Sequence, residues 1–335
     1  MSTTSYIQPV EPVLITFNRS EKLHATLTAF FNAGWSNRIF HVLDNASDDN
    51  TAEVVSQFKD SWPGLQYHRN PYNIGGNANI LRSLEIADSP YHWVIGDDDE
   101  WIFAGADELE RVLQADKADV VRLGWLVQEH SRGQYIPLSK LLDTEPLAFA
   151  SSSMISATII RRSQIVLSLP LAYHHIAYAY PQLVSLLTAD PAKVEVYTLT
   201  QNYMVHTPSN EIGYFVGDLE WYACWLAMSR LIKNRQHRFN FIREIFVLMR
   251  GEGISQLAIA LWLTQVALNA KGMNMPQGSL LLNMLGDGKG YRLPISFAAI
   301  VYCVIPFSLA RALRRLYRRY TGKSTEIPKR AESRL

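Results

Sequence analysis

Residues 93–101 read WVIGDDDEW, in which an apolar run passes directly into three aspartates, Asp97, Asp98 and Asp99. Acidic side chains repel one another, so such a cluster destabilises a fold unless it is solvated or neutralised. In an extended segment the first and third side chains point the same way, so Asp97 and Asp99 can meet while Asp98 points elsewhere. Carboxylate oxygens in this arrangement suit a hard cation such as Mg²⁺ or Mn²⁺. The stretch therefore predicts a buried strand that ends in a metal site.

A solvated loop that caps the next helix is the alternative interpretation of the aspartate triplet. Trp101, Ile102 and Phe103 follow closely, so the triplet lies between apolar segments, which favours the metal interpretation. An EF-hand is disfavoured because the sixth position counted from Asp97 is Ile102 rather than glycine.

Strand and helix patterns alternate through residues 1–125. Short β-branched and aromatic runs alternate with stretches whose apolar residues recur every three or four positions. The expected strands are 13–17, 39–43, 65–68, 91–95 and 120–123. This order predicts an α/β fold with a mostly parallel, Rossmann-like sheet, in which ligands bind beyond the carboxyl ends of the strands. The aspartate triplet follows one of those ends.

Two further polar segments follow predicted strands. In LDNASDDNT (43–51), Asp44 is a candidate acceptor for a base N–H or a ribose hydroxyl, and the rest suits turn and helix-capping chemistry. In RNPYNIGGNANI (69–80), Gly75 and Gly76 permit close backbone approach, and a following helix N-terminus attracts phosphate. A plain turn with a helix cap is the alternative for this segment.

Four segments therefore occur in a recognisable order: TFNR (16–19), LDNASDDNT (43–51), NIGGNAN (73–79) and WVIGDDDE (93–100). Together they resemble the nucleotide-sugar-binding half of family 2 glycosyltransferases with the GT-A fold. The stretch GGNANILRSLEIADSPYHWVIGDDDE is most similar to bacterial abequosyltransferase-like and rhamnosyltransferase-like enzymes, which build O-antigens and other surface glycans. The resemblance covers about residues 10–125.

The resemblance implies a role for each motif. The nucleotide sugar would be bound by residues at the strand ends: Thr16, Asn18, Arg19, Asp44, Asn73, Gly75, Gly76, Asp97 and Asp98. Asp44 would contact the base, and Asn73 with the two glycines would shape the pocket floor near the ribose. Asp97 and Asp99 would be the D-x-D pair that reaches the diphosphate through Mg²⁺ or Mn²⁺. The implied reaction moves a sugar from a nucleoside-diphosphate donor to a hydroxyl of a glycan acceptor, with inversion.

The resemblance leaves the general base open. Many family members supply an acidic residue from a Glu-Asp pair, and none stands in the corresponding stretch, SLPLAYHHIAYAYPQLV (168–184). His174 or His175 is the candidate base because the pKa of histidine lies near neutrality. A solvated or core-packed histidine pair is the alternative. Three more distant residues remain candidates: Asp190 and Glu211 as rival bases, and His206 as a late metal ligand.

Two regions are expected along the chain. Residues 1–215 would form the GT-A catalytic domain, with a nucleotide-sugar-binding half at 10–125 and an acceptor half at 126–215. Within the acceptor half, 151–160 is expected to be a buried strand entered by a serine loop. Residues 216–335 would form a helical C-terminal region.

The end of the chain is basic and amphipathic. Residues 293–310 carry no charge, and from Arg311 to Leu335 there are nine basic and two acidic residues. Five of the arginines recur every three or four positions and so share one helical face. The pattern predicts an amphipathic basic tail, at about 293–323, that lies on an anionic leaflet. A true membrane span and a buried core helix with a solvated tail are the alternatives.

Composition, cysteine positions and the N-terminal sequence narrow the class of protein and its expected location. Lys+Arg 32 against Asp+Glu 31 gives a net charge of +1, which argues against a nucleic-acid-binding protein. Cys224 and Cys303 are far apart, which excludes a disulfide scaffold and fits a reducing compartment. The N-terminal MSTTSYIQPVEP lacks a signal-peptide pattern. We therefore expect a peripheral enzyme on the cytoplasmic face of the cell membrane, with an acceptor linked to polyprenyl diphosphate.

Two other functional classes remain open. A nucleotidyltransferase that makes nucleotide sugars also uses carboxylates and metal on an α/β sheet, but usually carries a glycine-rich loop after the first strand. Here that place holds FNRSEKL (17–23), which contains no glycine. A scaffold that has lost catalysis is the second alternative. The missing Glu-Asp pair favours it, and the intact D-x-D pair disfavours it.

Overall fold

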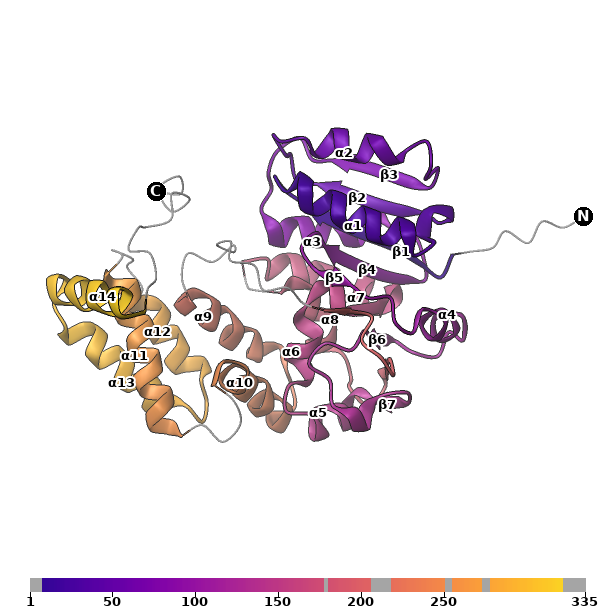
Figure 1. Cartoon of the computed structure of the whole chain (residues 1–335). Helices are drawn as coiled ribbons and strands as arrows, with labels where there is room; N and C mark the ends of the chain where they lie inside the picture. The colour runs from indigo at the N-terminus through magenta and orange to yellow at the C-terminus, as the bar shows by residue number, and fades with distance from the viewer. Residues whose placement is uncertain (1–7, 178–179, 206–217, 251–254, 273–277, 322–335) are drawn as a thin grey trace, which may run out of the picture. The chain divides into compact units, whose positions relative to one another are not determined.

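The computed structural model describes residues 8–177, 180–205, 218–250, 255–272 and 278–321 (Figure 1). Contacts within the chain divide it into two compact units, Met1–Ser209 and Asn210–Leu335, which we call unit 1 and unit 2. The predicted domain boundary after residue 215 falls outside the described residues. Each unit is described by itself.

Unit 1 is built on an eight-stranded sheet of order β3-β2-β1-β4-β8-β6-β9-β7. β8 and β7 run antiparallel to their neighbours and every other pair is parallel, so the predicted mostly parallel sheet is confirmed. A two-stranded sheet pairs β10 with β5. The strands are β1 (Val10–Thr16), β2 (Phe40–Asp44), β3 (Leu65–Arg69), β4 (Tyr91–Gly96), β5 (Glu100–Trp101), β6 (Val120–Arg122), β7 (Tyr135–Pro137), β8 (Thr158–Arg161), β9 (Glu195–Thr198) and β10 (Met204–Val205).

Helices of unit 1 flank the large sheet on both faces (Figure 1). The helices are α1 (Ser20–Asn32), α2 (Thr51–Phe58), α3 (Gly76–Ile86), α4 (Ala106–Gln114), α5 (Leu138–Thr144), α6 (Ala148–Ser153), α7 (Arg162–His174) and α8 (Val184–Thr188). The alternation of strands and helices through β6 follows the order expected from the sequence.

The main core of unit 1 lies between the sheet and helices α1, α2 and α4. Alternate residues of β1 and β4, such as Leu14 and Trp93, point to this face and pack against Phe30 of α1. The intervening residues point to the other face, which α3 and α7 cover. This alternation is the period-two pattern of a strand buried on both faces.

The prediction of one strand over residues 151–160 is wrong for its first half. Residues up to Ser153 belong to α6, and only Thr158–Arg161 form β8. The hydroxyls of Ser151 and Ser152 donate to the carbonyl of Ala148, and that of Ser153 donates to Ala150. Serine can satisfy its polar group inside a helix in this way, so a serine run does not require a loop.

Unit 2 is helical, as expected from the sequence. Its helices are α9 (Asp218–Met228), α10 (Arg235–Arg250), α11 (Gln256–Gly272), α12 (Gly278–Asp287), α13 (Arg292–Val304) and α14 (Phe307–Thr321). Trp225 stacks on Phe241 with ring centroids 4.4 Å apart and donates its indole N–H to the Phe241 carbonyl. α11 packs against both α13 and α14.

The apolar run and the basic tail form two helices rather than one. In the part of the chain that the structure describes, no single helix has the length and hydropathy of a membrane span. The pair Arg292–Val304 and Phe307–Leu316 meets both criteria only when taken together, across a bend of 112°. Arg311 and Arg315 are exposed but Arg314 is buried, so Arg314 does not contribute to the exposed basic surface of the tail.

Candidate functional site

Four strands end side by side along one edge of the sheet. The parallel register aligns Thr16 with Asp44 and Asp44 with Arg69, while Ile15 aligns with Gly96. The last residues of β1, β2, β3 and β4 are therefore neighbours, and a polar segment follows each of them. The structure brings the four sequence motifs to one edge, where ligands bind in open parallel sheets.

Asp97 joins the first of these segments to the fourth. Its carboxylate is 3% exposed and accepts hydrogen bonds from the Thr16 hydroxyl at 2.7 Å and from the Arg19 guanidinium at 3.0 Å. Its backbone carbonyl accepts one from the Thr26 hydroxyl at 3.1 Å. Burial raises the pKa of Asp97, whereas the Thr16 hydrogen bond and the Arg19 charge oppose that rise. The carboxylate is thus fixed by donors from the end of β1 and from the loop before α1.

Asp98 and Asp99 lie closer to solvent than Asp97. Arg19 also contacts Asp98, with 3.1 Å between nitrogen and oxygen, so one guanidinium bridges two of the three aspartates. A Cβ atom built on Gly96 would lie 3.3 Å from Oδ1 of Asp98 and 3.5 Å from Oδ2 of Asp99. The two carboxylates therefore approach the same point above the glycine, which has no side chain to keep them apart.

Asp98 and Asp99 fit a divalent cation that is held jointly by the protein and by the phosphates of a bound substrate. Within the described ranges, no three His, Cys, Asp or Glu side chains are grouped to hold a metal ion. Mg²⁺ is commonly bound by only one or two carboxylates together with substrate phosphates, so two oxygens above Gly96 suffice for that mode of binding. The assignment of Asp97 and Asp99 as metal ligands stays a prediction, to which this geometry adds Asp98.

Asp44 is engaged with the protein on both of its oxygens. The side chain is 1% exposed and accepts hydrogen bonds from the Ser47 backbone N–H at 2.8 Å and from the Tyr67 hydroxyl at 2.6 Å. The Arg69 guanidinium lies 3.3 Å from the same oxygen that Tyr67 contacts. The contact of Asp44 with a nucleotide base stays a prediction.

Tyr67 and Arg69 were not singled out from the sequence. Burial, and then the hydrogen bond to Asp44, raise the pKa of Tyr67, which keeps it a neutral donor. The Arg69 guanidinium also donates to the Ser47 carbonyl at 2.9 Å, which fixes an exposed cation at the end of β3. The available signal was the alternation of β3, which places both residues on the side of the sheet that Asp44 faces.

The loops after β1 and β2 are bonded to each other. The Ser47 hydroxyl accepts the Asn18 backbone N–H at 2.9 Å, and the Asn18 side chain accepts the Asp48 backbone N–H at 2.7 Å. Asp49 accepts the backbone N–H of Ser20 at 2.8 Å and that of Thr51 at 3.1 Å, so one carboxylate caps the N-termini of α1 and α2. The predicted turn and capping chemistry of this segment is confirmed.

A chain of asparagines shapes the third segment. Asn45 donates to the Asn73 side chain at 2.8 Å, and the Asn73 oxygen also accepts the Gly75 backbone N–H at 2.9 Å. Asn70, fully buried, donates to Asn45 at 2.9 Å. Gly75 has φ +83° and ψ 157°, a backbone conformation open to glycine alone, and Gly76 is the first residue of α3. The predicted glycine turn before a helix N-terminus is confirmed.

The two candidate bases lie where α7 ends. His174 is the last residue of α7 and His175 follows it, with ring centroids 4.9 Å apart. The Asn77 side chain, in the first turn of α3, donates to the Ile176 carbonyl at 2.9 Å, which ties the histidine turn to the third segment. Burial, and then the charge of His174, lower the pKa of His175.

Of the three more distant candidates, only Asp190 lies among the described residues. Asp190 precedes β9, which runs parallel to β6, so it lies at the amino ends of the parallel strands and away from the site. It pairs there with Lys193 at 3.7 Å, so the proposal of Asp190 as a base is wrong. Glu211 and His206 lie outside the described residues.

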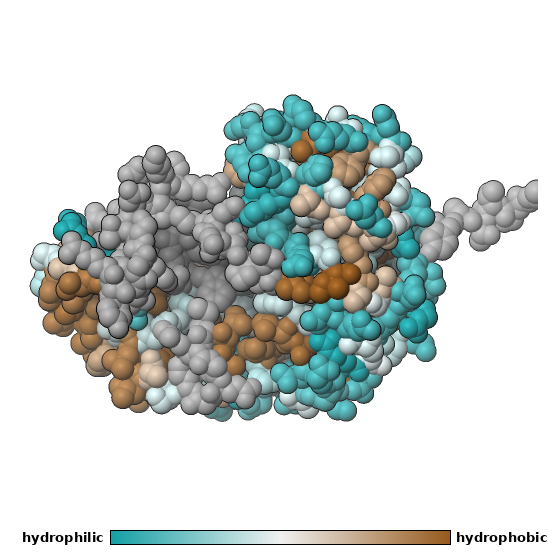
Figure 2. All heavy atoms as spheres, viewed as in Figure 1, coloured by the Kyte–Doolittle hydropathy of each residue, from teal (hydrophilic) through white to brown (hydrophobic). Residues whose placement is uncertain are grey.

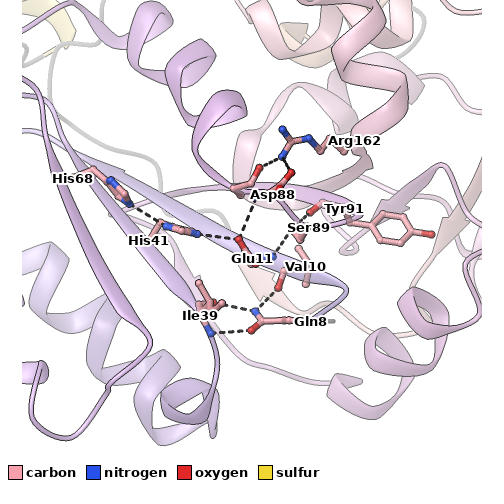
Figure 3. Close-up of polar contacts among 11 residues, drawn as sticks. Gln8, Val10, Glu11, Ile39, His41, His68, Asp88, Ser89, Tyr91 and Arg162 are labelled. Carbon is pink, nitrogen blue, oxygen red and sulfur yellow. Dashed lines mark hydrogen bonds and ion pairs between the residues drawn. The ribbon is translucent and has the colours of Figure 1, made fainter. Parts of the chain in front are cut away.

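A second polar cluster lies on the sheet face that α3 covers (Figure 3). His41 of β2 is 3.2 Å from Glu11 of β1 and 3.1 Å from His68 of β3, in a row across three strands. Glu11 also accepts the Asp88 backbone N–H at 3.3 Å. Burial lowers the pKa of both His41 and His68. The sequence does not reveal this cluster, because only the strand register brings the three residues together.

Residues 13–168 match the family model described as "Glycosyl transferase family 2". Among curated proteins, "Abequosyltransferase RfbV" of Salmonella typhimurium is 33% identical over 87 residues. That match covers 25% of this chain and 26% of the relative, so the chain spans about a quarter of the length of the curated protein it matches.

Two solved structures show a similar fold. S. aureus TarS 1-349 in complex with UDP-GlcNAc has a TM-score of 0.59 at 15% identity, over 95% of this chain and 93% of that one. A longer S. aureus TarS structure has a TM-score of 0.57 at 16% identity, over 93% of this chain and 55% of that one. At such low identity the likeness concerns the fold.

Proposed function

Residues 13–168 form a family 2 glycosyltransferase domain with the GT-A fold, and from this premise we propose that the protein is an inverting glycosyltransferase. It would move a sugar from a nucleoside-diphosphate donor to a hydroxyl of a glycan acceptor. One observation carries the proposal: four polar segments, distant in sequence, are hydrogen-bonded to one another at a single sheet edge. A scaffold without ligand has no need to hold three aspartates and an arginine at that edge.

The strand-end residues would bind the donor by charge and by fixed amides. Arg19 is positioned by Asp97 and Asp98, and its partly exposed guanidinium would attract the diphosphate. Arg69 supplies a second exposed cation, held in place by Asp44. The asparagine chain would fix the Gly75 backbone, which leaves the N-terminus of α3 open to an anion.

A divalent cation, Mg²⁺ or Mn²⁺, fits the aspartates at the end of β4. Asp97 and Asp99 are the ligands expected from the sequence, and the positions of Asp98 and Asp99 above Gly96 support two adjacent oxygen ligands. When bound, the cation would stabilise the charge that develops on the departing nucleoside diphosphate. The protein's own part is to hold Asp97 in place through Thr16 and Arg19, and Asp98 through Arg19.

His175, or its neighbour His174, would deprotonate the acceptor hydroxyl. A histidine must be unprotonated to act as a general base, and burial of His175 lowers its pKa in the direction that keeps it unprotonated. The hydrogen bond from Asn77 to Ile176 supports this assignment because it fastens the turn after α7 to the glycine segment. The deprotonated hydroxyl would attack C1 of the sugar from the face opposite the diphosphate.

The acceptor is proposed to be a glycan on polyprenyl diphosphate, as in the synthesis of O-antigens and other bacterial surface polysaccharides. The partial similarity to an abequosyltransferase supports this class. The basic helix α14 supports a peripheral location on the cytoplasmic face of the membrane, where such acceptors are found.

The first test is a donor panel. The purified chain is titrated with UDP-, GDP-, CDP- and dTDP-sugars in a thermal-shift assay, with and without Mn²⁺, alongside Asp99→Ala. We expect one donor to raise the melting temperature in a metal-dependent way, and the variant to lose this effect. Asp60→Ala, at an exposed site near the end of α2, is the matched control. Stabilisation by no donor would overturn the assignment of the site and favour the scaffold alternative.

A further inference from the structure

α13 exposes four large apolar side chains along one side: Leu293, Phe297, Ile300 and Val304. Steps of four, three and four residues return to the same side of a helix, so these residues form a continuous row, which we call the α13 stripe. Leu293 is 82% exposed and Val304 is 72% exposed. Ile295 and Ala298, on the opposite side of the helix, are fully buried in unit 2.

Neighbouring helices extend this apolar surface. α11 runs parallel to α13, because Gln256 donates to the Gly290 carbonyl at one end and Lys271 donates to the Tyr302 carbonyl at the other. The exposed Leu257 and Leu261 of α11 therefore lie at the same end of unit 2 as the start of the stripe. α14 adds three exposed leucines: Leu309, Leu313 and Leu316. Figure 2 shows hydrophobic surface gathered over these helices.

An apolar surface of this kind needs a partner. A helix that is apolar on all sides is normally buried, yet α13 carries no charged residue from Leu293 to Val304 and still exposes its stripe. Contiguous exposed apolar surface is typical of protein or membrane interaction sites. The charges around the stripe decide between these two.

The charged residues of α13 and α14 are all basic. From Gly288 to Thr325 the sequence has eight Lys and Arg residues and no Asp or Glu. Arg292, at the start of α13, and Arg311 and Arg315, on α14, are exposed. Apolar surface beside uncompensated positive charge complements a bilayer whose headgroups are anionic. A bilayer accounts for both features together, because its anionic headgroups lie directly beside its apolar layer.

We propose that the α13 stripe enters the interfacial layer of an anionic bilayer, with the exposed arginines at the headgroups. α13 has 13 residues, and at about 1.5 Å per residue it is far shorter than a hydrocarbon core of about 30 Å, so it lies along the surface. The 112° bend directs α14 away from the axis of α13. The inference rests on the proposed function, for which it names the membrane-binding surface that would bring the enzyme to a lipid-linked acceptor.

Co-sedimentation with vesicles tests the stripe. The full chain is mixed with phosphatidylcholine vesicles and with mixed phosphatidylcholine–phosphatidylglycerol vesicles. We expect strong binding to the mixed vesicles. Leu293→Ser and Ile300→Ser should each weaken it roughly tenfold, because each removes an exposed apolar side chain that the bilayer would bury. Leu167→Ser is the matched control, since Leu167 on α7 of unit 1 is 86% exposed and lies outside the stripe.

The charge variants separate the electrostatic contribution to vesicle binding from the contribution of the apolar stripe. The double variant Arg311→Glu with Arg315→Glu should abolish the preference for phosphatidylglycerol, because it reverses two exposed charges on α14. Binding that survives both stripe variants unchanged would overturn the proposal. Binding by electrostatics alone, with no loss in Leu293→Ser, would overturn it equally.

Cys303 provides an independent probe that needs no change in the stripe. It is exposed beside Val304, and Cys224→Ser leaves it as the single thiol. An environment-sensitive dye on Cys303 should shift to the blue on mixed vesicles and be quenched by brominated lipid chains. A dye that stays in water on bound vesicles would overturn the proposal. A blue shift that depends on protein concentration without lipid would show that a second copy of the chain covers the stripe, which also overturns it.

Donor binding distinguishes this inference from the proposed function. The stripe lies in unit 2, whereas the donor site is built entirely from unit 1. The stripe variants should therefore show the same nucleotide-sugar thermal shift as the unchanged protein. Loss of vesicle binding with intact donor binding would confirm the separation. If the protein binds vesicles but neither it nor any of its variants binds a donor, the proposed function is refuted and the membrane-binding surface is retained.

Discussion

The Thr16 hydroxyl, at the end of β1, donates a 2.7 Å hydrogen bond to the carboxylate of Asp97, directly after β4. The two residues are 81 positions apart in sequence, and both are buried. Because β1 and β4 are adjacent parallel strands, this bond connects the first and last motifs of the site across one strand spacing. The acidic segment is therefore held by the sheet itself and not by its own loop.

Thr16→Val should weaken that connection without changing the shape of the core. The loss of the hydroxyl donor leaves a buried carboxylate oxygen without that hydrogen bond, which is expected to lower the free energy of unfolding by about 1–3 kcal/mol. The loosened Asp97 should also raise the KM for the donor. Denaturant unfolding and steady-state kinetics measure both effects. Thr144→Val, at an exposed site in α5, is the control and should change neither.

Gly96→Ala should impair transfer while the protein remains folded. The added methyl group would lie 3.3 Å from Oδ1 of Asp98 and 3.5 Å from Oδ2 of Asp99, so it would make ordinary contact with Asp99 but would shift the Asp98 carboxylate by a few tenths of an ångström. A shift of this size is expected to lower kcat/KM by up to about tenfold. Gly286→Ala on α12 meets no atom within 4 Å and is the matched control. Unchanged kcat/KM would show that these carboxylates do not act in transfer.

His175→Gln should lower kcat by about 10²- to 10⁴-fold if this residue takes the proton of the acceptor. Because burial lowers the pKa of His175, kcat/KM of the unchanged enzyme should fall only below about pH 6.5, where a free histidine titrates. The pH profile of the variant should lose this acidic limb. His130→Ala, at an exposed site, is the control. An acidic limb that persists would transfer the role to His174 or to a carboxylate.

The buried histidines should make stability fall in acid. Burial lowers the pKa of His92 to about 3, and it also lowers the pKa of His41 and His68. Below about pH 6.5 the unfolded chain binds protons that the folded chain refuses, so the free energy of unfolding decreases by up to about 1.4 kcal/mol per pH unit for each such residue. Denaturant unfolding between pH 8 and about pH 4 measures the slope.

His92→Leu isolates one of these contributions. The His92 ring nitrogens have no hydrogen-bond partner among the described residues, and the ring borders a small cavity together with Thr158 and Gln182. Its replacement should reduce the pH slope by the share of one histidine and leave stability near pH 8 nearly unchanged. A slope that does not change would show that His92 is charged in the folded protein or is reached by water.

The nucleotide-sugar half of the fold could be predicted because its signals are local. β1, β2 and β4 are short, largely apolar strands, and β3 alternates apolar with polar residues. Each of the four is followed by polar residues that the parallel order must bring to one edge. The glycine turn before α3 was equally visible, since only glycine adopts the conformation of Gly75. In this half of the fold, the local sequence pattern and the order of the strands in the sheet therefore lead to the same site.

The features that the sequence did not reveal depend on register or on competing local bonds. Glu11, His41 and His68 become neighbours only when three strands are aligned. The serine run of α6 satisfies its hydroxyls within the helix, which composition alone does not indicate. The position of Asp190 followed from the direction of β9, and the base could not be derived because no spacing rule links it to the metal motif.

Asp49 caps both α1 and α2, and this has a consequence for how the chain acquires its structure. The Ser20 N–H at the start of α1 is satisfied by a carboxylate 29 residues further along the chain. During synthesis α1 therefore emerges without its cap, and it gains one only after β2 and the following turn have been made. The first helix and the second should consequently become stable in a single step, as one folding unit, and a change at Asp49 should slow the formation of both.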